Sequence, residues 1–180
     1  MDETRKARRP VAAWGILPAC AALFVLGSKH FLPAIVASHF DAAGRANGFM
    51  GRDAYVSLML ILSVVVPVVI ALIALRAFKQ PATRIHLPHP EYWLAPQRRE
   101  ETLDYLSRQV VRFSSMLTLF LCYVQVLVIV ANETSPPRLP MHGVAAGLTV
   151  YLGSVFVWLV MFGRHFRLPA RADAPRGKQR

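Results

Sequence analysis

The sequence predicts an all-α membrane protein with four transmembrane helices, both ends in the cytoplasm (N-in/C-in), an ordered outer loop and a short interfacial cytoplasmic helix. Three observations support this fold class. The chain has 180 residues, of which 54% are hydrophobic. Four stretches of 19 to 25 residues lack Asp, Glu, Lys and Arg, and a helix needs ~20 residues to cross ~30 Å of hydrocarbon. Basic residues gather in alternate segments between these stretches.

The uncharged stretches are residues 10–28, 54–75, 113–132 and 139–163. We expect helices there, because backbone groups in hydrocarbon must be hydrogen-bonded within their own segment and the stretches lack the alternation of barrel strands. The predicted spans are about 10–31, 54–76, 111–132 and 142–163, in one transmembrane domain, 10–163. Residues 1–9 and 164–180 are expected to be cytoplasmic tails, the second of them basic.

Lys and Arg are distributed unevenly along the chain. Seventeen lie in the two tails and the middle connection, against four in the first and third connections. The positive-inside rule places the richer segments in the cytoplasm, so we predict a multi-pass membrane protein with both ends on the cytoplasmic side. The net charge of +11 is then a topology signal and an attraction to the lipid bilayer. We expect no nucleic-acid partner, because no nucleic-acid-binding motif accompanies the charge.

The first span and the outer loop follow in chain order. Pro10 suits a helix start, where a missing N–H is tolerated. A cleaved signal peptide is the alternative interpretation, but the apolar run is longer than a usual signal core. The outer loop, 33–53, contains Asn47-Gly48, a strong turn dipeptide, and Gly44, which permits positive φ. We therefore expect an ordered loop, and a short hairpin starting near Val36 is one option.

The second span is predicted to start after Asp53 as the N-cap residue and to carry a kink or packing notch at Pro67. In the middle connection, a helix should start near Pro96 and lead into the third span. Its apolar residues share one face, which favours an interfacial helix on the lipid headgroups. Asp104 and Arg108 are spaced for an ion pair along that helix.

The third and fourth spans should form a hairpin, because the turn between them, 133–142, holds three prolines. Gly143 and Gly147 form a small-xxx-small pattern that allows close helix approach. The pattern serves packing inside the bundle or a homo-oligomer, and the sequence leaves both open. Gln125, in the third span, is expected to make a hydrogen bond between helices.

Catalytic chemistry finds little support. The chain has no nucleophile elbow, phosphate loop, dinucleotide fingerprint or His-Glu-x-x-His, and we predict no catalytic residues. The spans also lack the ionisable groups that coupled transporters use at depth. His39, Asp41 and His142 are candidate ligands for a divalent metal, the one cofactor considered. The alternative is that His39 and Asp41 hydrogen-bond the loop backbone, with Asp41 capping the turn toward Gly44.

Two segments resemble a bacterial membrane family. The first runs from Leu32-Pro33 through His39-Phe40-Asp41 and Gly44 to Asn47-Gly48-Phe49. It resembles the signature of the domain-of-unknown-function family 1648, which follows a first transmembrane helix. The segment Tyr92-Trp93-Leu94 with Arg98-Arg99 is similar to a cytoplasmic segment of that family. Members carry Asn-Lys where His89-Pro90 stand, and Glu where Gln97 stands.

The resemblance implies a multi-pass protein of the bacterial inner membrane, and it implies little chemistry, since the family is largely uncharacterised. Some members are joined to a second module in immunity proteins that protect bacteria from a secreted toxin. We expect binding, immunity-like protection or signalling with an unidentified protein or peptide partner. The expected outer contact residues are Pro33, His39, Phe40, Asp41, Gly44, Asn47 and Gly48. The expected cytoplasmic contact residues are Tyr92, Trp93, Leu94, Arg98 and Arg99. The alternative is a metal-dependent membrane enzyme or small transporter that uses His39, Asp41 and His142.

Overall fold

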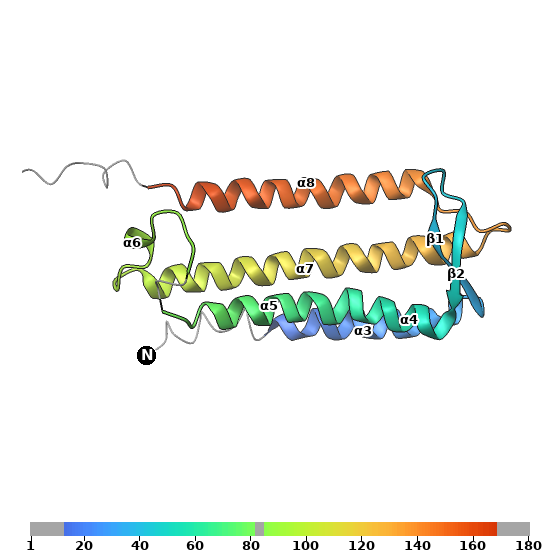
Figure 1. Cartoon of the computed structure of the whole chain (residues 1–180), viewed down its shortest axis with the longest axis horizontal. Coiled ribbons are helices and arrows are strands. Elements are labelled where there is room, and N and C mark those ends of the chain that lie inside the picture. The colour runs from blue at the N-terminus through green and yellow to red at the C-terminus, as the bar shows by residue number, and fades with distance from the viewer. Residues whose placement is uncertain (1–12, 82–84, 169–180) are drawn as a thin grey trace, which may run out of the picture.

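The computed structural model describes residues 13–81 and 85–168, and their fold is mostly helical (Figure 1). Long helices lie side by side, and a β-hairpin crosses one end of the bundle. The helices are α3 (Ile16–Ser28), α4 (Arg52–Leu60), α5 (Val66–Ala77), α6 (Pro90–Trp93), α7 (Arg99–Asn132) and α8 (Met141–His165). The strands are β1 (Ile35–Phe40) and β2 (Ala46–Gly51). Short 3₁₀ turns, Ala13–Gly15 and Lys29–Phe31, flank α3.

Three helical segments within the described residues are long and apolar enough to cross a membrane: Arg52–Ala77, Arg99–Asn132 and Met141–His165. They correspond to the second, third and fourth predicted spans and indicate a membrane protein. The first predicted span, 10–31, begins outside the described residues. What the structure describes of it is a shorter apolar helix, Ile16–Phe31.

The outer loop is a β-hairpin, so the fold class needs a correction from all-α to mostly helical. β1 and β2 pair antiparallel, with Ile35 opposite Gly51 and an irregular register at His39. β-branched Ile35 and Val36 favour the first strand, and the chain turns at Gly44, whose φ is 75°. The hairpin that the sequence allowed as one option is thus confirmed. The predicted turn at Asn47-Gly48 is wrong, because both residues lie within β2.

The second span, Arg52–Ala77, contains a π-helical turn at Ile61–Val65 between α4 and α5. Pro67 lies two residues after this turn, where its missing N–H prevents a regular helical hydrogen bond. The expected irregularity at Pro67 therefore takes the form of a π turn. Asp53 is not the N-cap residue, because β2 leads straight into α4 and Gly51 takes that position. Asp53 instead pairs with Lys29 at 2.6 Å.

α7 is one uninterrupted helix of 34 residues, about 51 Å long at 1.5 Å per residue. The sequence predicted that a helix starting near Pro96 leads into the third span, and α7 confirms this. No Gly or Pro occurs from Arg99 to Asn132 to interrupt it. The ion pair expected between Asp104 and Arg108 is not formed; within the described ranges the ion pair present is Lys29–Asp53. α7 contacts α3, α5 and α8 and is the centre of the bundle.

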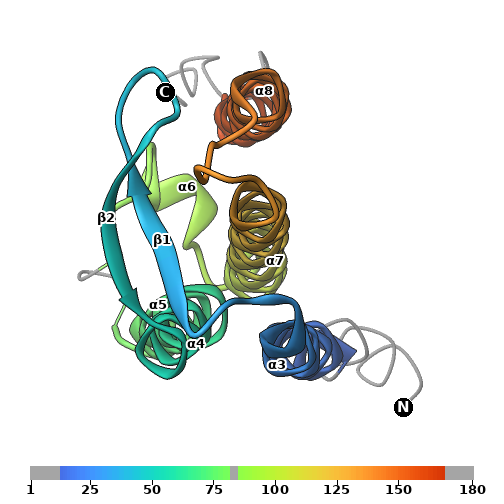
Figure 2. The same cartoon turned by 90° about the vertical axis from the view of Figure 1, so that its right-hand side faces the viewer.

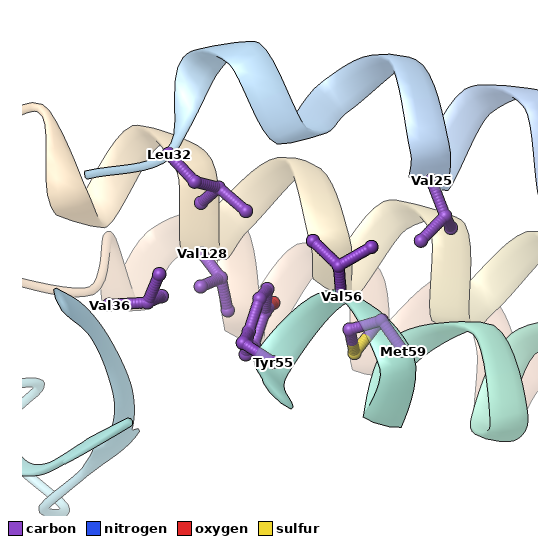
Figure 3. Close-up of a cluster of buried hydrophobic side chains, with 7 residues drawn as sticks. All are labelled: Val25, Leu32, Val36, Tyr55, Val56, Met59 and Val128. Carbon is purple, nitrogen blue, oxygen red and sulfur yellow. The ribbon is translucent and has the colours of Figure 1, made fainter. Parts of the chain in front are cut away.

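A buried polar network joins α3, α4 and α7. The Tyr55 hydroxyl donates to Gln125 Oε1 at 2.9 Å, and Gln125 Nε2 donates to Ser28 Oγ at 2.8 Å. Ser28 in turn donates to the Val25 carbonyl at 2.8 Å. Tyr55 and Val25 also belong to the buried apolar cluster of Figure 3, which includes Val56. The predicted inter-helix hydrogen bond of Gln125 is confirmed, and it connects three helices at once.

We expect Gln125→Met to lower the free energy of unfolding by about 1–2 kcal/mol, because it leaves the buried Tyr55 hydroxyl without its acceptor. Thermal unfolding in detergent measures this loss. Tyr151→Phe is the matched control, since the Tyr151 hydroxyl makes no hydrogen bond to any described residue. Equal midpoints for the two variants would show that the network contributes nothing.

The main packing partner of α8 is α7, and none of the residues of α8 is fully buried. The two helices meet where Gly143 and Gly147 receive the Tyr123 side chain. The Tyr123 hydroxyl donates to the Gly143 carbonyl at 2.8 Å. A Cβ added at Gly147 would overlap the Tyr123 ring. Of the two uses left open for the small-xxx-small pattern, packing inside the bundle is confirmed.

Gly147→Ala should lower stability by about 1–3 kcal/mol, because the methyl group and the Tyr123 ring would occupy the same space. Gly153→Ala, in the same helix, adds its methyl group where nothing lies within 4 Å. That control should keep or slightly raise the unfolding temperature, since Ala favours a helix over Gly. Combining Gly147→Ala with Tyr123→Leu should recover part of the loss. If Gly147→Ala and Gly153→Ala unfold at the same temperature, the proposed seat for Tyr123 is wrong.

Candidate functional site

The outer hairpin is fastened to the bundle through its backbone. Asn132, the last residue of α7, accepts a hydrogen bond from the Ala37 N–H at 2.8 Å and donates to the Ala37 carbonyl at 3.0 Å. Its amide also donates to Val128 of its own helix at 2.8 Å. Arg52 donates to the Leu32 carbonyl at 3.1 Å. Asn132 thus ties the middle of β1 to the end of α7. Arg52 ties the segment that leads into β1 to the start of α4.

The hairpin tip is held by a capped turn and by the connection between α7 and α8. Asp41 Oδ1 accepts the N–H groups of Ala43 and Arg45 at 2.9 and 2.8 Å. The Gly44 carbonyl accepts the Leu139 N–H at 2.8 Å. A side chain at Gly44 would place its Cβ 2.7 Å from the Leu139 carbonyl oxygen, so this position requires glycine for both space and φ. Figure 2 views the bundle from the end that carries the hairpin, and the hairpin extends across this end from α4 toward α8.

The predicted outer contact residues divide into exposed and structural positions. Pro33, His39, Asp41 and Asn47 are exposed. Phe40 is partly buried and packs against the apolar cluster, Gly44 is buried, and Gly48 lies against the His39 side chain.

Two apolar side chains on the hairpin are exposed and were not among the predicted contact residues. They are Ile35, with an exposed fraction of 62%, and Phe49, with 57%. Phe49 lies on the more exposed face of β2, since exposure alternates along this strand.

The three candidate metal ligands do not form a cluster. His39 Nδ1 is 3.0 Å from the Ser38 hydroxyl, and Asp41 is occupied by the backbone N–H groups of its own turn. His142 lies in the first turn of α8. No group of three His, Cys, Asp or Glu residues that could hold a metal occurs in the described ranges. The prediction that Asp41 caps its turn is confirmed, whereas His39 bonds a hydroxyl and not the loop backbone.

The predicted cytoplasmic residues join α6, α7 and the end of α8. Trp93 Nε1 donates to the Phe166 carbonyl at 3.2 Å, and Thr102 donates to the Trp93 carbonyl at 2.8 Å. The indole also stacks with His165 at 5.4 Å between ring centroids. Phe166 is 2% exposed and fills the space beneath these groups. Trp93 therefore has a clear structural role in holding the end of α8.

The remaining cytoplasmic residues lie around this contact. Leu94 is buried. The Arg98 guanidinium lies 4.0 Å from the centre of the Tyr92 ring, in a cation–π arrangement. Arg99 Nη2 donates to the Gln80 carbonyl at 3.0 Å. Arg98 is the exposed member of this set.

Comparison with protein-family models gave no match, and neither the curated proteins nor the solved structures contain a significant match. The resemblance of the outer and cytoplasmic segments to a bacterial membrane family therefore stays a prediction.

Replacing Asn132 with Leu should loosen the hairpin, because Ala37 loses both of its backbone partners. With about 0.5–1.5 kcal/mol for each hydrogen bond, amide exchange across 35–51 should become on the order of 10-fold faster. Hydrogen–deuterium exchange measures this, with the peptide covering 113–128 as an internal reference for the bundle. Asn47→Leu changes an exposed asparagine of the same hairpin and should leave exchange unaltered. Unchanged protection of the hairpin in Asn132→Leu would contradict the role given to this residue.

Proposed function

We propose that this chain is a four-span protein of the bacterial inner membrane with both ends in the cytoplasm. In this proposal it acts without catalysis, by contacting a protein or peptide partner at its outer hairpin, in an immunity-like or signalling accessory role. The proposal counts as the first span the segment that ends at Phe31, in addition to the three long helices. Its support is that the uncharged run of sequence starts at Pro10, ahead of the described helix Ile16–Phe31.

The observation that favours a binding role is the combination of a fixed backbone and exposed side chains in the hairpin. Asn132 and Leu139 hold β1 and the tip in place, so a partner would meet a preformed surface and lose little conformational entropy on binding. Exposed apolar side chains on an ordered element beside polar ones are typical of interaction sites. Ile35 and Phe49 supply the apolar part of this surface, and His39 and Asn47 the polar part.

The orientation is supported by the distribution of charge. Arg108, Arg112 and Arg164 lie at the end of the bundle opposite the hairpin, as do the basic segments around Arg76 and Lys79. A reporter enzyme that works only in the cytoplasm should be active when fused after Arg180. A reporter enzyme that works only in the periplasm should be active when inserted at Ala42. The reverse result at either position would overturn the proposed topology.

The binding role is tested in a deletion strain that is complemented with variants. Ile35→Ser combined with Phe49→Ser should fail to restore the phenotype of the deletion, measured as toxin sensitivity or as reporter output, although the protein accumulates at the normal level. Phe156→Ser is the matched control, because Phe156 is exposed to 66% on α8, far from the hairpin. Full complementation by the hairpin variant would contradict the proposal.

The metal-dependent alternative is tested by metal analysis of the purified protein. A stoichiometric ion that is lost on His39→Ala would favour it over the binding role.

A further inference from the structure

A basic hollow lies between α7 and α8 at the end opposite the hairpin. Its volume is about 630 Å³. The lining residues are Tyr105, Arg108, Gln109, Arg112, Met161, Arg164 and His165. Three guanidinium groups thus surround one space, two of them from successive turns of α7 and one from the last turn of α8.

These arginines have no carboxylate partner in the part of the chain that the structure describes, where the ion pair present is Lys29–Asp53. Arg108 and Arg112 are four residues apart on one helix, a spacing at which like charges repel each other. Arg112 Nη1 has one weak contact, 3.4 Å from Gln109 Oε1, and that oxygen also accepts the Trp158 N–H at 2.9 Å. An anion placed among the three would relieve the repulsion, and arginine is well suited to bind phosphate oxygens.

An apolar groove continues from this hollow along the two helices. Arg112 and Met161 also line a second hollow of about 470 Å³, together with Met116, Val150 and Gly153. Met116 and Val150 in turn line a third, of about 380 Å³, which ends at Gly147 and Tyr123. From Met161 to Gly147 the helix rises about 21 Å, which exceeds half of the ~30 Å hydrocarbon thickness. The groove is therefore long enough for one acyl chain of one membrane leaflet.

We propose that an anionic phospholipid binds between α7 and α8. Its phosphate is held by Arg108, Arg112 and Arg164, and one acyl chain lies in the groove that passes Gly153 and ends at Gly147. The charge of the hollow selects an anionic headgroup, and the apolar groove that opens from it selects a molecule with a hydrocarbon tail. The inference requires only that the chain spans a bilayer, and it is independent of the role proposed for the outer hairpin.

The first test is a lipid titration of the purified protein in a neutral detergent, followed by native mass spectrometry. Phosphatidylglycerol should bind at least about 5-fold more tightly than phosphatidylcholine, because its headgroup is anionic, that of phosphatidylcholine is zwitterionic, and each arginine near an anionic headgroup contributes about 5-fold. Arg112→Gln with Arg164→Gln should remove this preference. Arg45→Gln with Arg138→Gln, at the hairpin end, makes the same change in net charge and should keep it. Equal binding of the two lipids by the unaltered protein would overturn the proposal, and so would an equal loss in both double variants.

The second test separates a lipid from a free anion and from a second copy of the chain. Gly153→Phe fills the groove at a position where an added side chain meets no atom within 4 Å, and Gly163→Phe is an equally open control outside the three hollows. Gly153→Phe should weaken phosphatidylglycerol binding about 10-fold, the loss expected when about two methylene groups of the acyl chain leave the groove, and the control should not. Inorganic phosphate at the same concentration should not compete. Competition by phosphate without an effect of Gly153→Phe would indicate a free-anion site. A lipid-free dimer that is lost on Gly153→Phe would place a second copy in the groove, and either result overturns the proposal.

Discussion

The arrangement of this bundle depends on the buried amide of Gln125. In lipid, apolar side chains gain little by choosing one helix over another, whereas a polar group in hydrocarbon must find a partner. Gln125 finds two, the Tyr55 hydroxyl on α4 and the Ser28 hydroxyl on α3. Together these bonds set the position of both helices along α7. Asn132 follows seven residues later, on the same face of α7, and bonds the strand that joins α3 to α4 through the hairpin. The outer surface is therefore aligned by the same stripe of polar residues that aligns the helices.

Local sequence patterns predicted the parts of the fold that depend on local chemistry. The uncharged runs gave the second, third and fourth spans, Pro67 gave an irregular turn, and Asp41 gave a capped loop. The failures share a different origin. Asn132 marks the end of an apolar run in the sequence, and only the fold brings it to Ala37, 95 residues away. Asp53 had a good local position for an N-cap, but the hairpin put Gly51 there and Lys29 within reach. The candidate metal ligands His39, Asp41 and His142 were grouped because the sequence predicts that they lie on one side of the membrane. Sharing a side says nothing about distance, and Asp41 is taken up by its own turn.

The two ends of the molecule use the same principle with different chemistry. At the hairpin end, a side-chain amide takes the place of a neighbouring strand, since Asn132 satisfies both backbone groups of Ala37. At the opposite end, the Trp93 indole satisfies the carbonyl of Phe166, which the end of α8 would otherwise leave without a partner. In both cases a polar side chain that satisfies a backbone group also holds one element against another. The side chains that complete the backbone hydrogen bonding at the two ends of the bundle therefore also hold the elements of this small protein together.

α8 is the exception to this pattern, and its position follows from the solvent. A helix with no buried residue would be unstable beside a soluble core, because its apolar side chains would face water. In a bilayer the same side chains face lipid, so the seat for Tyr123, the Trp158–Gln109 hydrogen bond and the contact around Trp93 are enough to hold it. Beside these contacts the helices leave hollows with largely apolar walls, and the hollow remote from the hairpin is basic. In a membrane, hydrocarbon chains fill apolar gaps, and guanidinium groups attract phosphates. On the lipid proposal, the limited burial of α8 and the basic hollow have one cause, because lipid would complete the packing that the protein leaves open.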